Sequence, residues 1–265
     1  MIVALDLRNG SLSLGLKEGS RWLIRKRFGL DPQRTADDWA LVFYAALRDA
    51  GLAGAKASRA IMSSVVPASC RAVKTAVAEV FGAAVLLVGP GLRTGLKIRT
   101  DHPAELGTDL VCMAVAANAQ FPEDVVVIDS SGAALTFSAV NAAGEFLGAA
   151  FVPGIEVAAA SLRAAAAQIP QIDLEAPSRA IGRNTTQSLA SGIVNGYRGL
   201  MDGLIADMGR EMGIDPGAGP VVVGSGVDPK PLVAPTKGFA HYDPWLCLEG
   251  LTILGERNAR ESATS

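Results

Sequence analysis

Short apolar runs alternate with longer amphipathic segments along the first half of the chain. The runs have the length of buried strands, and the segments carry apolar side chains at helical spacing, as Trp39, Phe43 and Leu47 do. The expected strands are 2–7, 12–16, 60–66 and 84–88, and the expected helices are 37–50, 69–80 and 109–119. Residues 89–107 are rich in glycine and proline, which predicts a long loop.

The second half repeats this order of elements. Its expected strands are 125–129, 134–140, 146–152 and 220–223, and its expected helices are 156–168 and 186–212. In both halves a strand is followed by a hairpin and then by a helix, which predicts a duplicated α/β fold. Residues 260–265 are expected to be frayed.

Composition narrows the class of protein. Of 265 residues, 49% are hydrophobic and 19% are charged, which is typical of a globular chain. The net charge of −2 gives no general attraction to nucleic acid or anionic membranes, and no apolar run has the form of a spanning helix. Cys70, Cys112 and Cys247 are widely spaced, which favours reduced thiols over a disulfide framework. We therefore expect a cytoplasmic protein without nucleic-acid or membrane partners.

Two aspartates end apolar strands and are followed by turns that contain glycine. Asp6 precedes the turn Arg8-Asn9-Gly10, and Asp129 precedes the turn Ser130-Ser131-Gly132. Carboxylate oxygens bind Mg²⁺, and the N–H groups of glycine-containing turns bind phosphates. The repetition of this pattern predicts a nucleotide clamp that is built from two similar lobes.

Each of these features also has a purely structural explanation. An aspartate at the end of a strand often forms a turn or caps a helix. His102 and His241 are more often structural than ligands. The basic loop with Arg93, Lys97 and Arg99 is more often a solvated face than an anion site. No one of these features decides the function by itself.

An ordered set of motifs resembles the type III pantothenate kinase family. Asp6-Leu7-Arg8-Asn9 is similar to the family's opening Asp-x-Gly-Asn, and Gly107-Thr108-Asp109 falls where the family has Gly-Ala-Asp-Arg. The other similar segments, in the family's order, are 63–67, 94–99, 153–155, 181–185 and 248–251. The resemblance extends from residue 1 to about Asn258.

The resemblance implies a fold and a reaction. The family belongs to the actin-like/hexokinase-like ATPase superfamily, which implies two duplicated actin-like/ribonuclease H-like domains, each a mixed sheet flanked by helices. The implied lobes are 1–121 and 122–265. Members of the family phosphorylate pantothenate, in the first step towards coenzyme A, with ATP, Mg²⁺ and a monovalent cation. They do so as homodimers, so the resemblance also implies a homodimer here.

The resemblance also assigns roles to individual residues. Asp109 is the implied catalytic base, which accepts the proton of the substrate hydroxyl, and Asp6 and Asp129 are the implied metal ligands. Phosphate contacts are implied for the turn residues Arg8, Asn9, Ser131, Gly132, Gly224, Ser225 and Gly226. Contacts to pantothenate are implied for Gly107, Thr100, Leu110 and Thr185.

The chain departs from the family's pattern at several of these positions. Arg8 replaces a glycine, Gly10 replaces a hydroxyl residue, and the turn after Asp129 fits only with one inserted residue. Leu110 replaces the arginine that binds the pantothenate carboxylate, and Thr100 replaces a tyrosine. The loss of such a charge-assisted contact, worth about 1.5–3 kcal/mol, should weaken pantothenate binding.

Two hypotheses follow from these departures. In the first, the chain is a diverged homologue without pantothenate kinase activity that binds a ligand such as pantothenate or an analogue, regulates, or acts beside a protein partner. In the second, it is an active ATP-dependent kinase that phosphorylates pantothenate or another small alcohol. Arg8 would then hold phosphate in place of the monovalent cation, because a guanidinium group suits phosphate oxygens. The presence of Arg8 fits either hypothesis, so the sequence leaves both open.

Overall fold

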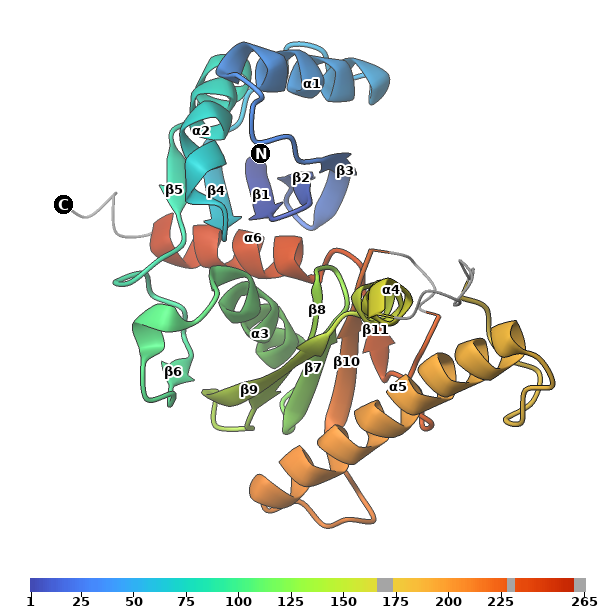
Figure 1. The fold of residues 1–265 in the computed structure, drawn as a ribbon. Coiled ribbons are helices and arrows are strands. Elements are labelled where there is room, and N and C mark those ends of the chain that lie inside the picture. The colour runs from blue at the N-terminus through green and yellow to red at the C-terminus, as the bar shows by residue number, and fades with distance from the viewer. Residues whose placement is uncertain (166–173, 228–231, 260–265) are drawn as a thin grey trace. The chain divides into compact units, whose positions relative to one another are not determined.

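The computed structural model describes residues 1–165, 174–227 and 232–259, and it divides into two compact units (Figure 1). The first unit consists of Met1–Ala119 together with Trp245–Ser265, and the second is Gln120–Pro244. In the part of the chain that the structure describes, no helix is long and apolar enough to cross a membrane.

A five-stranded mixed sheet forms the centre of the first unit. Its strands are β1 (Ile2–Arg8), β2 (Ser11–Glu18), β3 (Arg21–Gly29), β4 (Arg59–Ser64) and β5 (Val85–Leu87), in the spatial order β3-β2-β1-β4-β5. β1 pairs antiparallel with β2 and parallel with β4, and all seven of its residues are buried. The strand that carries Asp6 and Arg8 is therefore the middle of the sheet.

Helices cover the sheet of the first unit. They are α1 (Ala36–Asp49), α2 (Pro67–Phe81), α3 (Thr108–Gln120) and α6 (Leu246–Ala259), and the short elements β6 (Lys97–Ile98) and η1 (Pro103–Glu105) lie in the long loop before α3. A capping box between Thr35 and Asp38 begins α1, since each of the two residues bonds the other's backbone N–H. α3 is buried along most of its length, which explains why its sequence is apolar on every side.

The two faces of β1 pack against different helices, because successive side chains of a strand alternate. Val3, Leu5 and Leu7 belong to a hydrophobic core with α1 and α2. Ile2 lies on the other face, next to Gly255 of α6. Asp6 and Arg8 share the parity of Ile2, so the strand directs both side chains away from the α1–α2 core.

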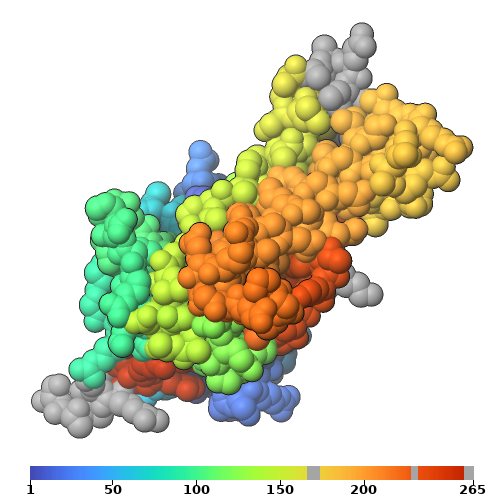
Figure 2. All heavy atoms as spheres, turned by 90° about the horizontal axis from the view of Figure 1, so that it is seen from below, coloured from blue at the N-terminus to red at the C-terminus, as the bar shows by residue number. Residues whose placement is uncertain are grey.

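The second unit also contains a mixed sheet. Within this unit its strands are β7 (Val125–Asp129), β8 (Ala134–Val140), β9 (Glu145–Pro153), β10 (Val221–Ser225) and β11 (His241–Tyr242), in the order β11-β10-β7-β8-β9. Its helices are α4 (Ile155–Ala165) and α5 (Thr185–Glu211). Val126 and Ile128 of β7 form a core with Val194 and Met201 of α5. α5 lies at the surface of the unit (yellow-orange to orange in Figure 2), and the Asn184 side chain caps its first turn.

The predicted α/β class with two mixed sheets flanked by helices is confirmed. The expected strands and helices are present with shifted ends, except that 166–168 of the helix expected at 156–168 lie outside the described residues, as do the residues 260–265 that were expected to be frayed. Strand β3 and helix α6 are new relative to the sequence prediction, as are the short elements β6, η1 and β11. All three cysteines are free thiols.

The compact units differ in one respect from the lobes 1–121 and 122–265. Helix α6 groups with the first unit, although it follows the second unit in the chain. Its Gly250 lies so close to α3 that a Cβ there would collide with the carbonyl oxygen of Cys112. The assignment of two actin-like lobes with a boundary after residue 121 stays a prediction.

Candidate functional site

The first unit brings three of the expected site residues together. Arg8 turns back on Asp6, and its Nε donates to Asp6 Oδ2 at 2.6 Å. Arg8 Nη1 lies 3.9 Å from Asp109 Oδ2, and Arg8 Nη2 lies 3.7 Å from the sulfur of Met113. The guanidinium group therefore lies beside the implied metal ligand and the implied catalytic base at once. We call Asp6, Arg8 and Asp109 the first-unit cluster.

Both members of the Asp6–Arg8 ion pair are deeply buried. Their side chains are 5% and 9% exposed, whereas that of Asp109 is 17% exposed. The second oxygen of Asp6, Oδ1, is buried and receives no hydrogen bond from any described residue. A buried carboxylate needs a partner for its charge, and Arg8 supplies that partner from within the same strand.

Local structure fixes the position of Asp109 at the start of α3. Thr108, the first residue of the helix, hydrogen-bonds through Oγ1 to Ser63 Oγ at 2.8 Å. Ser63 is fully buried and lies opposite Asp6 in the β1–β4 pairing. A Cβ at Gly107 would lie 2.6 Å from Asp109 Oδ1, so a side chain there would push the Asp109 carboxylate aside. Ser63 and Thr108 position the cluster, and no pattern in the sequence assigned a role to either.

The other expected residues of the first unit are not part of this cluster. Asn9 is exposed in the β1–β2 turn. Leu110, in the first turn of α3, is 5% exposed. The hydroxyl oxygen of Thr100 is buried and has no hydrogen-bond partner among the described residues.

Two buried thiols lie near the cluster. Burial, a hydrogen bond with Cys112 and the charge of Asp6 all raise the pKa of the Cys247 thiol well above its ordinary value. Cys70 differs because it is partly exposed, and its Sγ lies 3.0 Å from Ser64 Oγ. A raised pKa leaves little thiolate, which is the reactive form.

Thiol labelling should separate these cysteines. At mildly alkaline pH, iodoacetamide should modify Cys70 in the native protein, and Cys112 and Cys247 only after unfolding. Peptide mass spectrometry of samples taken over time measures the order of modification, and Cys70→Ser should remove the rapid phase. Rapid native labelling of Cys247 would contradict the packing of α6 against α3.

In the second unit, the loop after β7 closes on its own aspartate. Ser131 donates to Asp129 Oδ1 through its hydroxyl at 2.5 Å and through its backbone N–H at 3.2 Å. The carboxylate itself is buried. The neighbouring Ser130 instead donates through its hydroxyl to the carbonyl oxygen of Ser225, at 3.2 Å. Gly132 follows as an exposed residue of the same loop.

The Gly224-Ser225-Gly226 segment is buried at the end of β10. A Cβ at Gly226 would lie 2.5 Å from Ser130 Oγ, and a Cβ at Gly224 would lie 2.7 Å from Cδ1 of Phe239. Gly226 and Gly224 therefore allow the segments around Ser130 and Phe239 to pack closely against the end of β10. This packing explains both glycines without a role in phosphate binding. Ser225 is 3% exposed.

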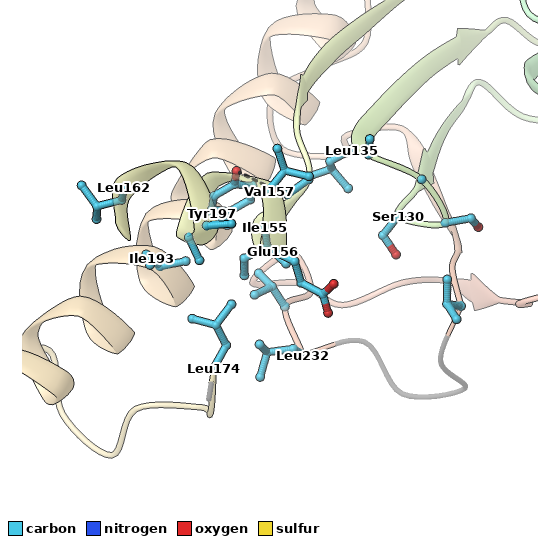
Figure 3. Close-up of a pocket in the computed structure, with 18 of the residues that line it drawn as sticks. Ser130, Leu135, Ile155, Glu156, Val157, Leu162, Leu174, Ile193, Tyr197 and Leu232 are labelled. Atoms are coloured by element: carbon cyan, nitrogen blue, oxygen red, sulfur yellow. Dashed lines mark hydrogen bonds between the residues drawn. The ribbon is translucent and has the colours of Figure 1, made fainter. Parts of the chain in front are cut away.

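A cavity of about 990 Å³ lies beside these loops, wholly within the second unit (Figure 3). Ser130, Ser131 and Gly132 line it together with residues of α4 and α5, most of them apolar. Glu156 directs its carboxylate into the cavity. The Tyr197 hydroxyl donates to the Pro153 carbonyl oxygen at 2.7 Å, and burial raises its pKa, so it stays protonated at neutral pH.

The structure therefore gives the expected residues different surroundings. Asp6, Arg8 and Asp109 are close neighbours in the first unit. In the second unit Ser131 and Gly132 line the cavity beside Asp129, whereas Ser225 pairs with Asp129 in the sheet and does not line the cavity. Thr185 is exposed at the first position of α5 and does not line the cavity. Sequence reasoning missed Glu156 and Tyr197, which lie in helices whose periodicity shows only that one face is apolar.

Comparison with known proteins assigns the chain to a family. The family model described as type III pantothenate kinase matches residues 2–207. A type III pantothenate kinase of Moorella thermoacetica is 35% identical over 259 residues, which cover 97% of this chain and 100% of the relative.

Solved structures show the same fold at low sequence identity. A putative 2-dehydro-3-deoxygalactonokinase from Sinorhizobium meliloti matches with a TM-score of 0.58 at 13% identity, covering 98% of this chain and 97% of that one. The ROK hexokinase of Thermus thermophilus matches with a TM-score of 0.51 at 14% identity, covering 97% and 99%. The expected hexokinase-like fold is confirmed, and this chain belongs to the type III pantothenate kinase family.

Proposed function

We propose that this protein is a ligand-binding member of the family that does not phosphorylate pantothenate and acts as a regulatory or partner subunit. The observation that carries the proposal is the buried ion pair between Arg8 and Asp6. In the family pattern a glycine stands at position 8, which leaves the aspartate open to the metal and the phosphates. Here a guanidinium group fills that space.

The carboxylates do not fit a directly bound Mg²⁺ ion. Arg8 Nε occupies one oxygen of Asp6 at 2.6 Å, and the other oxygen is buried. A divalent cation at Asp6 would have to displace a positive charge that already neutralises the carboxylate. Phosphoryl transfer depends on metal ions that neutralise the developing charge, so this site lacks a central requirement of the reaction.

The residue expected to bind pantothenate, the phosphate acceptor, supports the same proposal. Leu110 stands where the family has the arginine that binds the pantothenate carboxylate, and its apolar side chain is only 5% exposed. Without a charged partner, the carboxylate of pantothenate loses the contact that orients its hydroxyl for transfer. The ligand of the protein is therefore pantothenate held weakly, or an analogue without that carboxylate.

A second candidate function is an active ATP-dependent kinase. It is favoured by Asp109, which remains at the start of α3 with a partly exposed carboxylate and a glycine two residues before it. In that case Arg8 would supply the positive charge that members of the family take from a monovalent cation. Both proposals include a homodimer and a cytoplasmic location, because the family resemblance implies them.

Release of ADP tests the two candidates directly. With ATP, pantothenate, Mg²⁺ and K⁺, a coupled assay should show no more ADP release than the same mixture without pantothenate. Asp109→Asn should leave that background unchanged, and the Moorella thermoacetica relative serves as the positive control. Pantothenate-dependent turnover that Asp109→Asn abolishes would contradict the first proposal and establish the second.

A further inference from the structure

The cavity of the second unit lies between stripes of side chains from two helices. One wall comes from α5, where four lining residues recur at every fourth position and therefore lie along one side of the helix: Leu189, Ile193, Tyr197 and Met201. A volume of about 990 Å³ and a mostly apolar lining are typical of a site for a small molecule. The proposed function does not assign a ligand to the space between these helices.

The wall that α4 supplies carries two opposite charges. Four of its residues share a face of the helix and line the cavity: Glu156, Ala159, Ala160 and Arg163. Glu156 and Arg163 are two turns apart, or about 10 Å along the helix axis. The alanines between them have the smallest side chains that still favour a helix, so this wall leaves room for a ligand.

Both charged side chains are available to a ligand. Neither Glu156 nor Arg163 has a hydrogen bond or an ion pair with any residue that the structure describes, and both are exposed. Glu156 directs its carboxylate into the cavity (Figure 3). The helix dipole favours an acid in the first turn and a base in the last. It therefore explains the sign of each charge but not the position of both on the wall of a cavity.

The chemistry of the two ends differs. At the start of α4, a Cβ at Gly154 would lie 3.2 Å from the carbonyl oxygen of Gly132, so a second oxygen acceptor lies close to the first turn that carries Glu156. An ammonium group has three donors and no acceptor, which suits a carboxylate with another acceptor nearby. At the other end, the guanidinium group of Arg163 suits a carboxylate.

We propose that this cavity binds a linear aliphatic zwitterion, an ω-amino acid whose amino group pairs with Glu156 and whose carboxylate pairs with Arg163. The apolar stripe of α5 contacts the methylene chain between the two charged ends and removes it from water. The site lies within the second unit and goes beyond the proposed function, which rests on Arg8 and Asp6 in the first unit.

Isothermal titration of the full chain at low ionic strength tests the proposal, because salt screens exposed charges. The probes are 8-aminooctanoate, octylamine and octanoate, which carry both charges, the amine alone and the carboxylate alone. Extended 8-aminooctanoate separates its charges by about the length of two helical turns. It should bind with a Kd of about 1 mM or lower, and the other two probes should bind at least about threefold more weakly.

Two charge-removing variants should each affect one end of the ligand. Glu156→Gln should weaken 8-aminooctanoate and octylamine by at least about threefold without weakening octanoate. Arg163→Gln should weaken 8-aminooctanoate and octanoate to the same extent without weakening octylamine. Both side chains are exposed, so neither variant should unfold the protein. Glu211→Gln is the matched control, because it removes the same charge from the end of α5, outside the cavity lining, and should bind all three probes as the wild type does.

Ala160→Leu tests where the ligand lies. Ala160 stands between the two charges on α4, so a leucine there would fill the space of the methylene chain and weaken all three probes by at least about threefold. Unchanged affinity in this variant would overturn the proposal, as would the absence of binding at about 10 mM 8-aminooctanoate. Equal losses for all three probes in Glu156→Gln and Arg163→Gln would also overturn it, because they would indicate a change of structure and not two separate contacts. None of these results depends on the release of ADP, so the failure of this proposal and that of the proposed function are distinguishable.

Discussion

Replacing Arg8 by methionine should destabilise the first unit by about 3–5 kcal/mol. Methionine keeps much of the side-chain volume but leaves the Asp6 carboxylate in a buried position without its 2.6 Å partner. A buried charge that has lost its partner costs several kcal/mol, far more than the loss of one hydrogen bond. The measurement is urea unfolding followed by tryptophan fluorescence, which reports on this unit because Trp22, Trp39 and Trp245 all lie in it.

Two further variants make this result specific. The double variant Asp6→Leu with Arg8→Met removes both charges, and its stability should return to within about 1 kcal/mol of the wild type. Arg71→Met removes an exposed arginine of α2 and should change the free energy of unfolding by less than about 0.5 kcal/mol. If Arg8→Met is as stable as Arg71→Met, Asp6 does not depend on Arg8, and the structural basis of the proposed function is lost.

The closeness of Asp6 and Arg8 could be predicted from the sequence, but the direction of Arg8 could not. Residues two apart in a strand share a face, so the pairing is a direct consequence of β1. Whether the guanidinium reaches outward to phosphate or back to Asp6 depends on α3. Met113 of α3, which contacts Arg8, lies 105 residues further along the chain. Local patterns contain no information about such a contact.

The same limit explains the two longest elements that the sequence did not predict, β3 and α6. β3 has basic residues at four of nine positions, Arg21, Arg25, Lys26 and Arg27, which hides the apolar alternation of a strand. α6 contains Gly250 and Gly255, and each glycine costs a helix about 1 kcal/mol relative to alanine. Tertiary packing explains these glycines, because α3 and β1 approach α6 at those two positions.

The cavity of the second unit could not be predicted from the sequence either. Its volume depends on α4, α5 and the loops after β7 and β10 meeting in one place, and no short motif encodes that meeting. Ser131 is the instructive residue. The sequence showed an insertion after Asp129 but could not show that the Ser131 hydroxyl would bond the carboxylate. A departure from a family pattern identifies where chemistry has changed, and only the geometry tells in which direction.

Gly250→Ala should destabilise the first unit by about 3 kcal/mol, because an added methyl group would overlap the backbone of α3. The new Cβ would collide with the carbonyl oxygen of Cys112 and would lie 3.0 Å from its Cα. Backbone atoms in a buried helix cannot move aside cheaply, so α6 would have to shift away from α3. The gain in helix propensity, about 1 kcal/mol, is too small to offset this. Urea unfolding followed by tryptophan fluorescence measures the change in the free energy of unfolding.

Gly255→Ala is the matched control one and a half turns further along α6. There the added Cβ would meet Ile2 Cδ1 at 2.6 Å, and the end of a flexible side chain can move. We expect a change of less than about 1 kcal/mol, since the overlap and the gain in helix propensity oppose each other. Because the shift of α6 would separate it from α3 beside Cys112, Gly250→Ala should also expose Cys112 to iodoacetamide. If both variants are equally stable and their thiols stay protected, α6 does not pack closely against α3.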